Sequence, residues 1–433
     1  MRPWGMAFVK AELRVGAAKA YGPAVVVTRR ASDKLREGHL WVYRSDVVEL
    51  VPALDGAAIV GGSIVTVVDQ RGIPMGSSTY SDTSEITLRV VSPLAGFTRE
   101  LYLESVTEKI AAALALRREV VPECFAGAGT TGLRLLFSEG DGLPGIVADR
   151  YGSLVVVQLL TQGTAQDDVR AVVVAALRDG LDGDGLVIVE RPDPKVRELE
   201  KLGLPPAEAL YRHDADSVGF ASVFELNGLK FHFDAGSGQK TGAFLDQRLN
   251  YAAAARYAKG EALDVCTYQG GFALHMAQVC SSVTGVDASR GALEVAERNR
   301  ELNPGLRAQV DWIEADAFEL LREMEGSGQE YDTIVLDPPA FAKSRRAAEG
   351  ALRGYKELNL RAMKMVRDGG TLVTCSCSHH VPLVDFMEVV RSAAVDAGRR
   401  VQVMETRGAA ADHPSVVTLP ETDYLKCVVL RVG

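Results

Sequence analysis

Two cysteines separated by one residue, Cys375 and Cys377, close an apolar, β-branched stretch that reads GGTLVTCSCSHH over residues 369–380. In an extended strand their side chains point to the same face with Cα atoms roughly 6.6 Å apart, and parallel Cβ vectors disfavour a disulfide. Zinc could take both thiolates with His379 or His380, but structural zinc normally draws its ligands from two separated pairs. We therefore predict no metal site and interpret one of the two cysteines as a nucleophile.

A second motif whose residues could take part in a reaction is LDPPAF, residues 336–341. Its two prolines fix φ and remove backbone donors, which predicts either a simple strand stop or a rigid turn that holds Asp337 as a hydrogen-bond acceptor. An acceptor suits the exocyclic amine of cytosine, adenine or guanine but not the carbonyl of uracil, and Phe341 could stack on a base. A thiolate that adds to carbon 6 of cytosine makes carbon 5 reactive toward a methyl group, after which a base must remove the carbon-5 proton.

These residues lie within a region that begins near Phe231 and in which apolar strands alternate with amphipathic helices. The alternation is typical of a parallel, doubly wound sheet, whose ligands bind outside the carboxyl ends of its strands. Carboxylates lie in or directly after successive predicted strands, at Asp264, Asp287, Asp316 and Asp337. We therefore expect a ligand site along that edge.

The turn CTYQGGF after the first of these strands indicates which nucleoside cofactor binds. Its adjacent Gly270 and Gly271 lack the G-x-G-x-x-G spacing that cradles a pyrophosphate, so S-adenosylmethionine fits better than a nicotinamide dinucleotide. Asp287 lies 17 residues beyond Gly270, where a carboxylate can accept both ribose hydroxyls. Asp316 can accept from the adenine amino group. An α/β domain with capping aspartates and no cofactor is the plain alternative.

Length and composition limit the class of protein. A chain of 433 residues is longer than a single hydrophobic core normally accommodates and implies at least two domains. Its composition, 47% hydrophobic and 24% charged residues, is typical of a globular protein. Six cysteines without regular spacing do not indicate a secreted disulfide framework. The N-terminus lacks a signal-peptide core, and no run reaches the ~18 apolar residues of a membrane helix. We expect a cytoplasmic protein with reduced thiols and no membrane partner.

Three successive sequence patterns divide the chain into predicted domains. Alternating short stretches over residues 23–96 predict a small β-rich domain, and mixed strands and helices over 97–225 predict a central α/β domain that includes a helix near 99–121. Residues 226–433 form the doubly wound part, and residues 1–22 are an N-terminal extension. The net charge of −9 argues mildly against nucleic acid, but residues 29–44 hold five basic and two acidic residues. That segment is either a solvated face or a nucleic-acid contact.

The motifs occur together in a known order: GQKTGAFLDQR, CTYQGGFAL, GVDAS, LDPPAF, RGYKELN, SCS and ADHP…LPETDYLK. The chain resembles the RlmI-like family of S-adenosylmethionine-dependent, large-subunit (23S) ribosomal RNA cytosine-5 methyltransferases over about 400 of its 433 residues. The resemblance implies an N-terminal PUA domain that binds RNA, a Rossmann-like class I methyltransferase domain at the C-terminus, and ribosomal RNA, naked or in an assembling subunit, as substrate. Cys377 is then the nucleophile and Cys375 a packing residue. A homodimer is left open.

The resemblance and the motifs together define the candidate site. The catalytic residues are Cys377 and Asp337. The cofactor-binding residues are Phe244, Asp246, Gln247, Asp264, Tyr268, Gly270, Gly271, Asp287, Ala288, Asp316, Ala317 and Asp337. The RNA-contacting residues are Pro338, Phe341, Lys343, Arg29, Arg30, Lys34 and Arg36.

Two departures from the family pattern leave questions. Gln269 stands where relatives commonly have threonine, and the N-terminal extension is unusual. The family has no second cysteine beside D-P-P, so the group that removes the carbon-5 proton is unassigned, with Asp337, His379 and a water molecule as candidates. The alternatives to cytosine-5 methylation are methylation of a guanine or adenine nitrogen, of uracil carbon 5, or a non-catalytic RNA-binding assembly factor.

Overall fold

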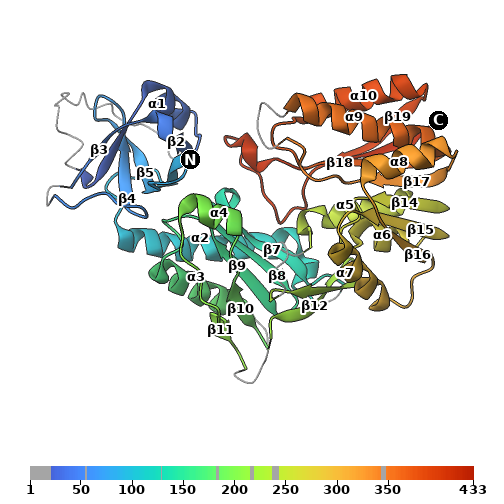
Figure 1. Cartoon of the computed structure of the whole chain (residues 1–433). Helices are drawn as coiled ribbons and strands as arrows, with labels where there is room; N and C mark the ends of the chain where they lie inside the picture. The colour runs from blue at the N-terminus through green and yellow to red at the C-terminus, as the bar shows by residue number, and fades with distance from the viewer. Residues whose placement is uncertain are drawn as a thin grey trace, which may run out of the picture.

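A computed structural model describes residues 21–53, 56–127, 129–181, 185–214, 219–236, 243–342 and 348–433. In these ranges four sheets form, of six, five, two and seven strands. Figure 1 shows an N-terminal part and a C-terminal part at opposite ends of a central part. None of the helices in these ranges combines the length and apolar character needed to cross a membrane. The predicted N-terminal extension lies outside the described residues except for its last two.

The N-terminal part is a six-stranded sheet in the order β2-β6-β5-β4-β1-β3. Its elements are β1 (Ala24–Val27), α1 (Arg29–Arg36), β2 (Trp41–Tyr43), β3 (Val47–Val51), β4 (Ile64–Val68), β5 (Pro74–Tyr80) and β6 (Ile86–Ser92). Helix α1 begins after Thr28, whose side chain accepts a hydrogen bond from the Ala31 amide and so satisfies one free donor of the first turn. The small β-rich domain predicted from the alternating stretches is confirmed.

The central part is a five-stranded sheet in the order β11-β10-β9-β8-β7, whose apolar side chains share a core with helices α2 and α3. Its elements are α2 (Arg99–Val120), β7 (Gly132–Phe137), β8 (Ile146–Tyr151), β9 (Leu154–Leu159), α3 (Asp167–Gly180), β10 (Val187–Glu190), α4 (Pro194–Glu200) and β11 (Tyr211–Arg212). The helix predicted near residues 99–121 is α2, which begins after Thr98, whose hydroxyl accepts from the Leu101 amide.

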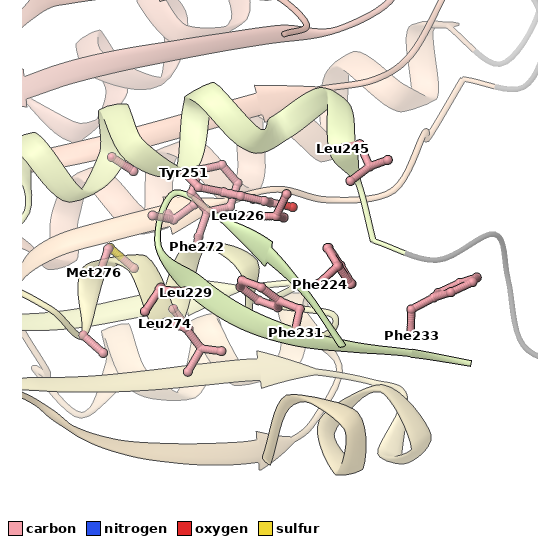
Figure 2. Packing of buried hydrophobic residues seen from close by; sticks show 14 of the residues in the cluster. Phe224, Leu226, Leu229, Phe231, Phe233, Leu245, Tyr251, Phe272, Leu274 and Met276 are labelled. Atoms are coloured by element: carbon pink, nitrogen blue, oxygen red, sulfur yellow. The ribbon is translucent and has the colours of Figure 1, made fainter. Parts of the chain in front are cut away.

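A hairpin joins the central part to the C-terminal part. It consists of β12 (Ala221–Leu226) and β13 (Leu229–Asp234). Its buried Phe224 and Phe231 share one core with Tyr151 of the central sheet and with Phe272 of the C-terminal part, and Figure 2 shows Phe224, Phe231 and Phe272 as members of this cluster. The domain boundary that we predicted between residues 225 and 226 falls inside β12, because the hairpin is one unit with apolar contacts on both sides.

The C-terminal part is a seven-stranded sheet in the order β16-β15-β14-β17-β18-β20-β19, in which β20 alone runs antiparallel to its neighbours. Its strands are β14 (Glu261–Val265), β15 (Ser282–Asp287), β16 (Gln309–Glu314), β17 (Tyr331–Leu336), β18 (Val366–Ser376), β19 (Val401–Arg407) and β20 (Lys426–Val432). Its helices are α5 (Arg248–Tyr257), α6 (Gly271–Met276), α7 (Arg290–Glu301), α8 (Ala317–Gly326), α9 (Ala348–Met365) and α10 (Leu383–Ala397). The predicted doubly wound sheet is confirmed.

The apolar runs of the central strands explain why both faces of this sheet are covered. Alternate residues of a strand point to opposite faces, so Val335 and Val373 lie in one core while Ile334 and Leu372 lie in another. Strands buried on both faces need apolar sequence without alternation, and residues 334–336 of β17 and 372–373 of β18 supply it. The polar residues that follow each strand are left at the carboxyl edge.

Candidate active site

The carboxyl edge of the seven-stranded sheet borders a cavity of about 880 Å³. The five strands that pair in parallel with one another, β14 to β18, all contribute to its lining through the residues at or just beyond their ends. These residues are Thr267, Asp287, Asp316, Asp337 and Cys377. The cavity has the size of a small-molecule site and lies where a doubly wound sheet binds its ligands, as predicted.

The turn after β14 is held in an unusual backbone conformation. Cys266 and Tyr268 have φ of +64° and +51°, which costs free energy for residues other than glycine. Hydrogen bonds offset this cost: the Thr267 hydroxyl donates to Asp264 Oδ2 at 2.6 Å, and the Tyr268 amide donates to Asp287 Oδ2 at 2.9 Å. Asp264 is fully buried behind the turn and outside the cavity lining, and burial raises its pKa to about 7. It shapes the turn rather than contacting a ligand.

The paired glycines serve packing within the protein. Gly270 has φ +84°, and a Cβ there would lie 3.0 Å from the Trp312 ring. A Cβ on Gly271 would lie 2.5 Å from the Tyr251 ring. Only Gly271 lines the cavity, so the turn needs both glycines even without a ligand.

Two carboxylates at the ends of β15 and β16 are oriented by backbone amides. Asp287 accepts one hydrogen bond on each oxygen, from the amides of Tyr268 (2.9 Å) and Ser289 (2.8 Å). Asp316 caps α8 by accepting from two of its amides on Oδ1, and no described residue donates to its Oδ2. Small or apolar side chains line the cavity around them: Val286, Ala288, Ala317 and Phe318. Carboxylate acceptors between apolar walls fit the hydroxyls, amino group and flat ring of an adenosine.

Asp337 lies at the start of the D-P-P turn and faces the cavity. The Gln247 side-chain amide donates to its Oδ1 at 3.0 Å, and Gln247 is held in turn by Asn250 at 2.7 Å. Burial, together with the nearby carboxylates of Asp246 and Asp264, raises the pKa of Asp337 to about 8. The carboxyl is therefore mostly protonated at neutral pH until a cation enters the cavity, since a nearby positive charge favours ionisation.

The segment just before α5 forms another wall of the cavity. Phe244 is 46% exposed, and its ring centroid lies 5.0 Å from that of Tyr268. Asp246 accepts a hydrogen bond of 2.6 Å from the Tyr424 hydroxyl. Phe244, Asp246 and Gln247 thus line the same cavity as the carboxylates, while the preceding residues 237–242 lie outside the described residues.

The two cysteines of the S-C-S stretch have separate surroundings. Cys375 is fully buried in the core, and in the register of β18 and β20 it lies opposite Cys427, which is also a free cysteine. Cys377 lies one residue beyond β18, is half-buried and lines the cavity, with its Sγ 4.0 Å from the Pro338 carbonyl oxygen. Burial and the carboxylates of Asp337 and Asp246 raise the pKa of Cys377 to about 12. No group of three or more possible metal ligands occurs among the described residues.

Comparison with known proteins assigns the chain to a family. Residues 215–416 match the S-adenosylmethionine-dependent methyltransferase family, and residues 25–93 match the PUA-like domain. The ribosomal RNA large subunit methyltransferase I of Shewanella amazonensis is 38% identical over 398 residues, which covers 91% of this chain and 95% of that protein. The protein of the same name from Klebsiella pneumoniae is 34% identical over 95% of this chain and 98% of its own length. The chain belongs to the ribosomal RNA large subunit methyltransferase I family.

Membership of this methyltransferase family makes S-adenosylmethionine the cofactor, as the cavity and the motifs predicted. A solved structure of SMU.776, described as a methyltransferase complexed with SAH, has a TM-score of 0.75 at 18% identity and covers 94% of this chain and 99% of that chain. A SAM-dependent methyltransferase from Streptococcus mutans has a TM-score of 0.74 with the same coverage. These two likenesses concern the fold, which extends over nearly the whole chain.

Lys426 is a residue of this methyltransferase to which sequence reasoning gave no role. It is buried, and its Nζ donates to the carbonyl oxygens of Ser378 at 2.8 Å and Tyr424 at 2.7 Å. Burial lowers the pKa of Lys426 to about 8, although the neighbouring Cys377 raises it. Lys426 therefore links the turn that carries Cys377 to the segment that carries Tyr424. A lysine followed at once by the apolar run CVVL was the available signal.

The central part also contributes to the cavity of this methyltransferase, which sequence reasoning did not predict. Arg134 of β7 lines the cavity and makes two hydrogen bonds of 2.8 Å to Asp149. The Arg134 amide donates to the buried Asp412, which also accepts from the buried Arg248 at 3.3 Å. This buried charge cluster fixes the central part against the methyltransferase domain beside the site.

The structure brings most of the predicted site residues together. Those that line the cavity are Phe244, Asp246, Gln247, Tyr268, Gly271, Asp287, Ala288, Asp316, Ala317, Asp337, Pro338, Phe341 and Cys377. Asp264 lies behind the turn and Gly270 within it, both outside the cavity lining, and Lys343 lies outside the described residues. The four basic candidates of the N-terminal part lie on α1, which does not line the cavity: Arg29, Arg30, Lys34 and Arg36.

Proposed function

We propose that this protein transfers a methyl group from S-adenosylmethionine to carbon 5 of a cytosine in large-subunit (23S) ribosomal RNA, with Cys377 as the nucleophile. The relatives described above carry the name ribosomal RNA large subunit methyltransferase I. The observation that supports the chemistry most is that Cys377 and Asp337 line one cavity from the ends of neighbouring strands. Methylation of a ring nitrogen or an exocyclic amine needs no thiol at that place.

The carboxylates of the cavity are suited to hold the cofactor. Asp287 has both oxygens oriented by amides and can accept from the two ribose hydroxyls, and Asp316 can accept from the adenine amino group through Oδ2. When bound, S-adenosylmethionine supplies a methyl group activated by its positive sulfonium. Phe244, Asp246 and Gln247 then cover the methyl-transfer centre.

Asp337 orients the cytosine. Ionised, it accepts from the exocyclic amine of the base, and protonated, it donates to ring nitrogen 3. Its pKa of about 8 lets either form occur near neutral pH. The Cys377 thiol, with a pKa of about 12, must lose its proton before it adds to carbon 6. A cation in the cavity lowers the pKa of both groups, so binding of the cofactor favours the reactive thiolate.

The RNA contacts that we propose lie in two places. Pro338 and Phe341 flank the base, and the Phe341 ring is held by a contact of 4.8 Å between its centroid and that of Tyr355. On α1 the side chain of Arg29 is 91% exposed; it lies 3.6 Å from Asp33 on the same helix, a surface pair that a phosphate group can displace. Arg30 is less available, because it donates to Asp46 at 2.8 Å. Lys34 and Arg36 complete this basic face, and Lys343 adds a further candidate.

The test uses ribosomal RNA transcribed with 5-fluorocytidine and S-adenosylmethionine that carries a labelled methyl group. Fluorine cannot leave carbon 5 as a proton, so the carbon-6 adduct persists and gives a labelled protein–RNA band that resists denaturation. We expect the band from the wild type and from Cys375→Ala, the matched control, whose cysteine is buried away from the cavity. Cys377→Ala should give none.

The other outcomes separate the alternatives. No band from any protein, with equal label on ordinary RNA from wild type and Cys377→Ala, would mean that the methyl group goes to nitrogen. A band with 5-fluorouridine RNA alone would identify uracil. No labelled RNA, with cofactor still bound, would identify a non-catalytic binding protein.

A further inference from the structure

The proposed reaction needs a base for the carbon-5 proton, and the geometry of the sheet indicates where it must lie. The cofactor carboxylates follow β15 and β16, and Cys377 follows β18 on the other side of β17. This order places the cofactor and the thiol on opposite sides of Asp337, so a cytosine held by Asp337 would receive the thiol and the methyl group on opposite faces. Addition of the methyl group from the cofactor face turns the carbon-5 proton toward the thiol face, so the base must lie on the side of Cys377.

A histidine beside Cys377 meets this condition. His379 follows Cys377 by two residues and lines the same cavity. Its ring lies beside that of Tyr424, with centroids 5.2 Å apart. Its Nδ1 lies 3.0 Å from the carbonyl oxygen of Glu421. A carbonyl oxygen only accepts, so Nδ1 carries the proton and Nε2 keeps its lone pair.

We propose that His379, through Nε2, is the general base that removes the carbon-5 proton and so releases the methylated cytosine from Cys377; this role rests on the proposed function. The proton moves from carbon 5 to Nε2, and the C–H electron pair forms the carbon 5–carbon 6 double bond. The bond between carbon 6 and Sγ breaks, and Cys377 leaves as a thiolate. The imidazolium then loses its proton to solvent, to which the ring is exposed.

The charged and titratable groups around the ring suit this role. His379 faces Glu421, Lys426 and His380, as well as Tyr424. Partial burial, with the positive charges of Lys426 and His380, lowers the pKa of His379, and only the interactions with Glu421 oppose this. The neutral, proton-accepting form is thus the resting form at neutral pH.

The other candidates fit less well. Asp337 is engaged at the amine edge of the base and with Gln247, so it does not face the carbon-5 proton. A water molecule could act only if the imidazole were dispensable, which the experiment below measures.

The test uses His379→Ala and His379→Asn with ordinary ribosomal RNA and labelled S-adenosylmethionine. The asparagine amide can still donate to the Glu421 carbonyl oxygen but has no basic nitrogen. Both variants should transfer the methyl group once and then release RNA roughly 10²–10⁴-fold more slowly, which is the range typical of general-base catalysis. A labelled, denaturation-resistant adduct should therefore accumulate on ordinary cytosine, and added imidazole should release RNA from His379→Ala. His213→Ala, which removes an exposed histidine that does not line the cavity, is the matched control and should turn over normally.

Each remaining outcome is decisive. Normal turnover by His379→Asn would overturn the proposal in favour of water or Asp337. Loss of the adduct even on 5-fluorocytidine RNA would overturn it too, because His379 would then act before methyl transfer. A wild type that forms no adduct on 5-fluorocytidine RNA would instead reject the proposed function itself, which separates the two failures.

Discussion

The cavity has two halves that are built differently. In the cofactor half, at the ends of β15 and β16, backbone amides orient Asp287 and Asp316. In the catalytic half, at the ends of β17 and β18, side chains from segments remote in the sequence orient the carboxylates. Gln247 reaches Asp337 from 90 residues away, and Tyr424 reaches Asp246 from 178 residues away.

The two halves also differ in how their ionisable groups are protonated. Burial and clustered carboxylates raise the pKa of both Asp337 and Cys377 in the catalytic half. Reactivity there depends on what binds, because a bound cation changes both protonation states. The cofactor half should bind its ligand whether or not the catalytic half is intact, and the predictions that follow test that independence.

The largest effect is expected for Asp337→Asn. The new Oδ1 can still accept from Gln247, but the Nδ2 amide group only donates, so the variant loses the ionised form that accepts from the amine of the cytosine. We expect methyl transfer to fall roughly 100-fold to 1,000-fold, measured as single-turnover transfer of labelled methyl to RNA. Calorimetry on the same variant should show cofactor affinity close to that of the wild type near neutral pH. A collapse of that affinity would show that the halves are not independent.

Asp287→Ala should weaken cofactor binding and leave the catalytic half intact. Loss of hydrogen bonds from the ribose to a charged group costs about 1.5–3 kcal/mol, so the Kd for S-adenosylmethionine should rise roughly 10-fold to 150-fold. At saturating cofactor the 5-fluorocytidine adduct should still form, since Cys377 and Asp337 are untouched. Asp311→Asn is the matched control, because Asp311 is an exposed acid of the neighbouring strand β16. A loss of the adduct that excess cofactor does not restore would contradict the prediction.

The two halves also differ in how far the sequence predicts them. The carboxylates of the cofactor half follow apolar strands, and parallel strands bring their carboxyl ends to one edge, so local pattern was enough. The same argument placed Asp264 at the site, but Asp264 lies inside β14, is fully buried and accepts from Thr267 outside the cavity lining. For the cysteines, spacing alone left both open, and only the family resemblance chose Cys377 over Cys375.

The catalytic half depends on contacts that no local pattern contains. Strand β20 lies between β18 and β19, and its register pairs Lys426 with Ser376. That register brings a buried amine next to the turn of Cys377. Arg134 reaches the cavity from the central part in the same unpredictable way. Such positions follow from tertiary packing, which is why sequence reasoning found Cys377 and Asp337 of the cavity lining and missed the residues that hold them.

Lys426→Met tests whether the hydrogen bonds and the charge of Lys426 matter for the reactivity of Cys377. The variant leaves the carbonyl oxygens of Ser378 and Tyr424 without their donor and removes a positive charge near Cys377. We expect kcat to fall about tenfold and the rising limb of its pH profile to move to higher pH, because the charge of Lys426 lowers the pKa of Cys377. Lys364→Met, which removes an exposed lysine paired with Glu325, should change neither. An unshifted profile would show that Lys426 only supports the turn.

The smallest effect concerns cofactor affinity against pH. The pKa of Asp337 is raised to about 8, so the group is neutral below that pH and negative above it. A sulfonium cation binds better beside the negative form, so affinity should increase as the pH rises, by roughly threefold from about pH 6 to about pH 8. Asp337→Asn should flatten this rise, whereas Asp287→Ala should lower affinity while keeping the slope. Equal slopes in wild type and Asp337→Asn would mean that the charge of Asp337 does not reach the cofactor, and the halves would then be electrostatically separate as well.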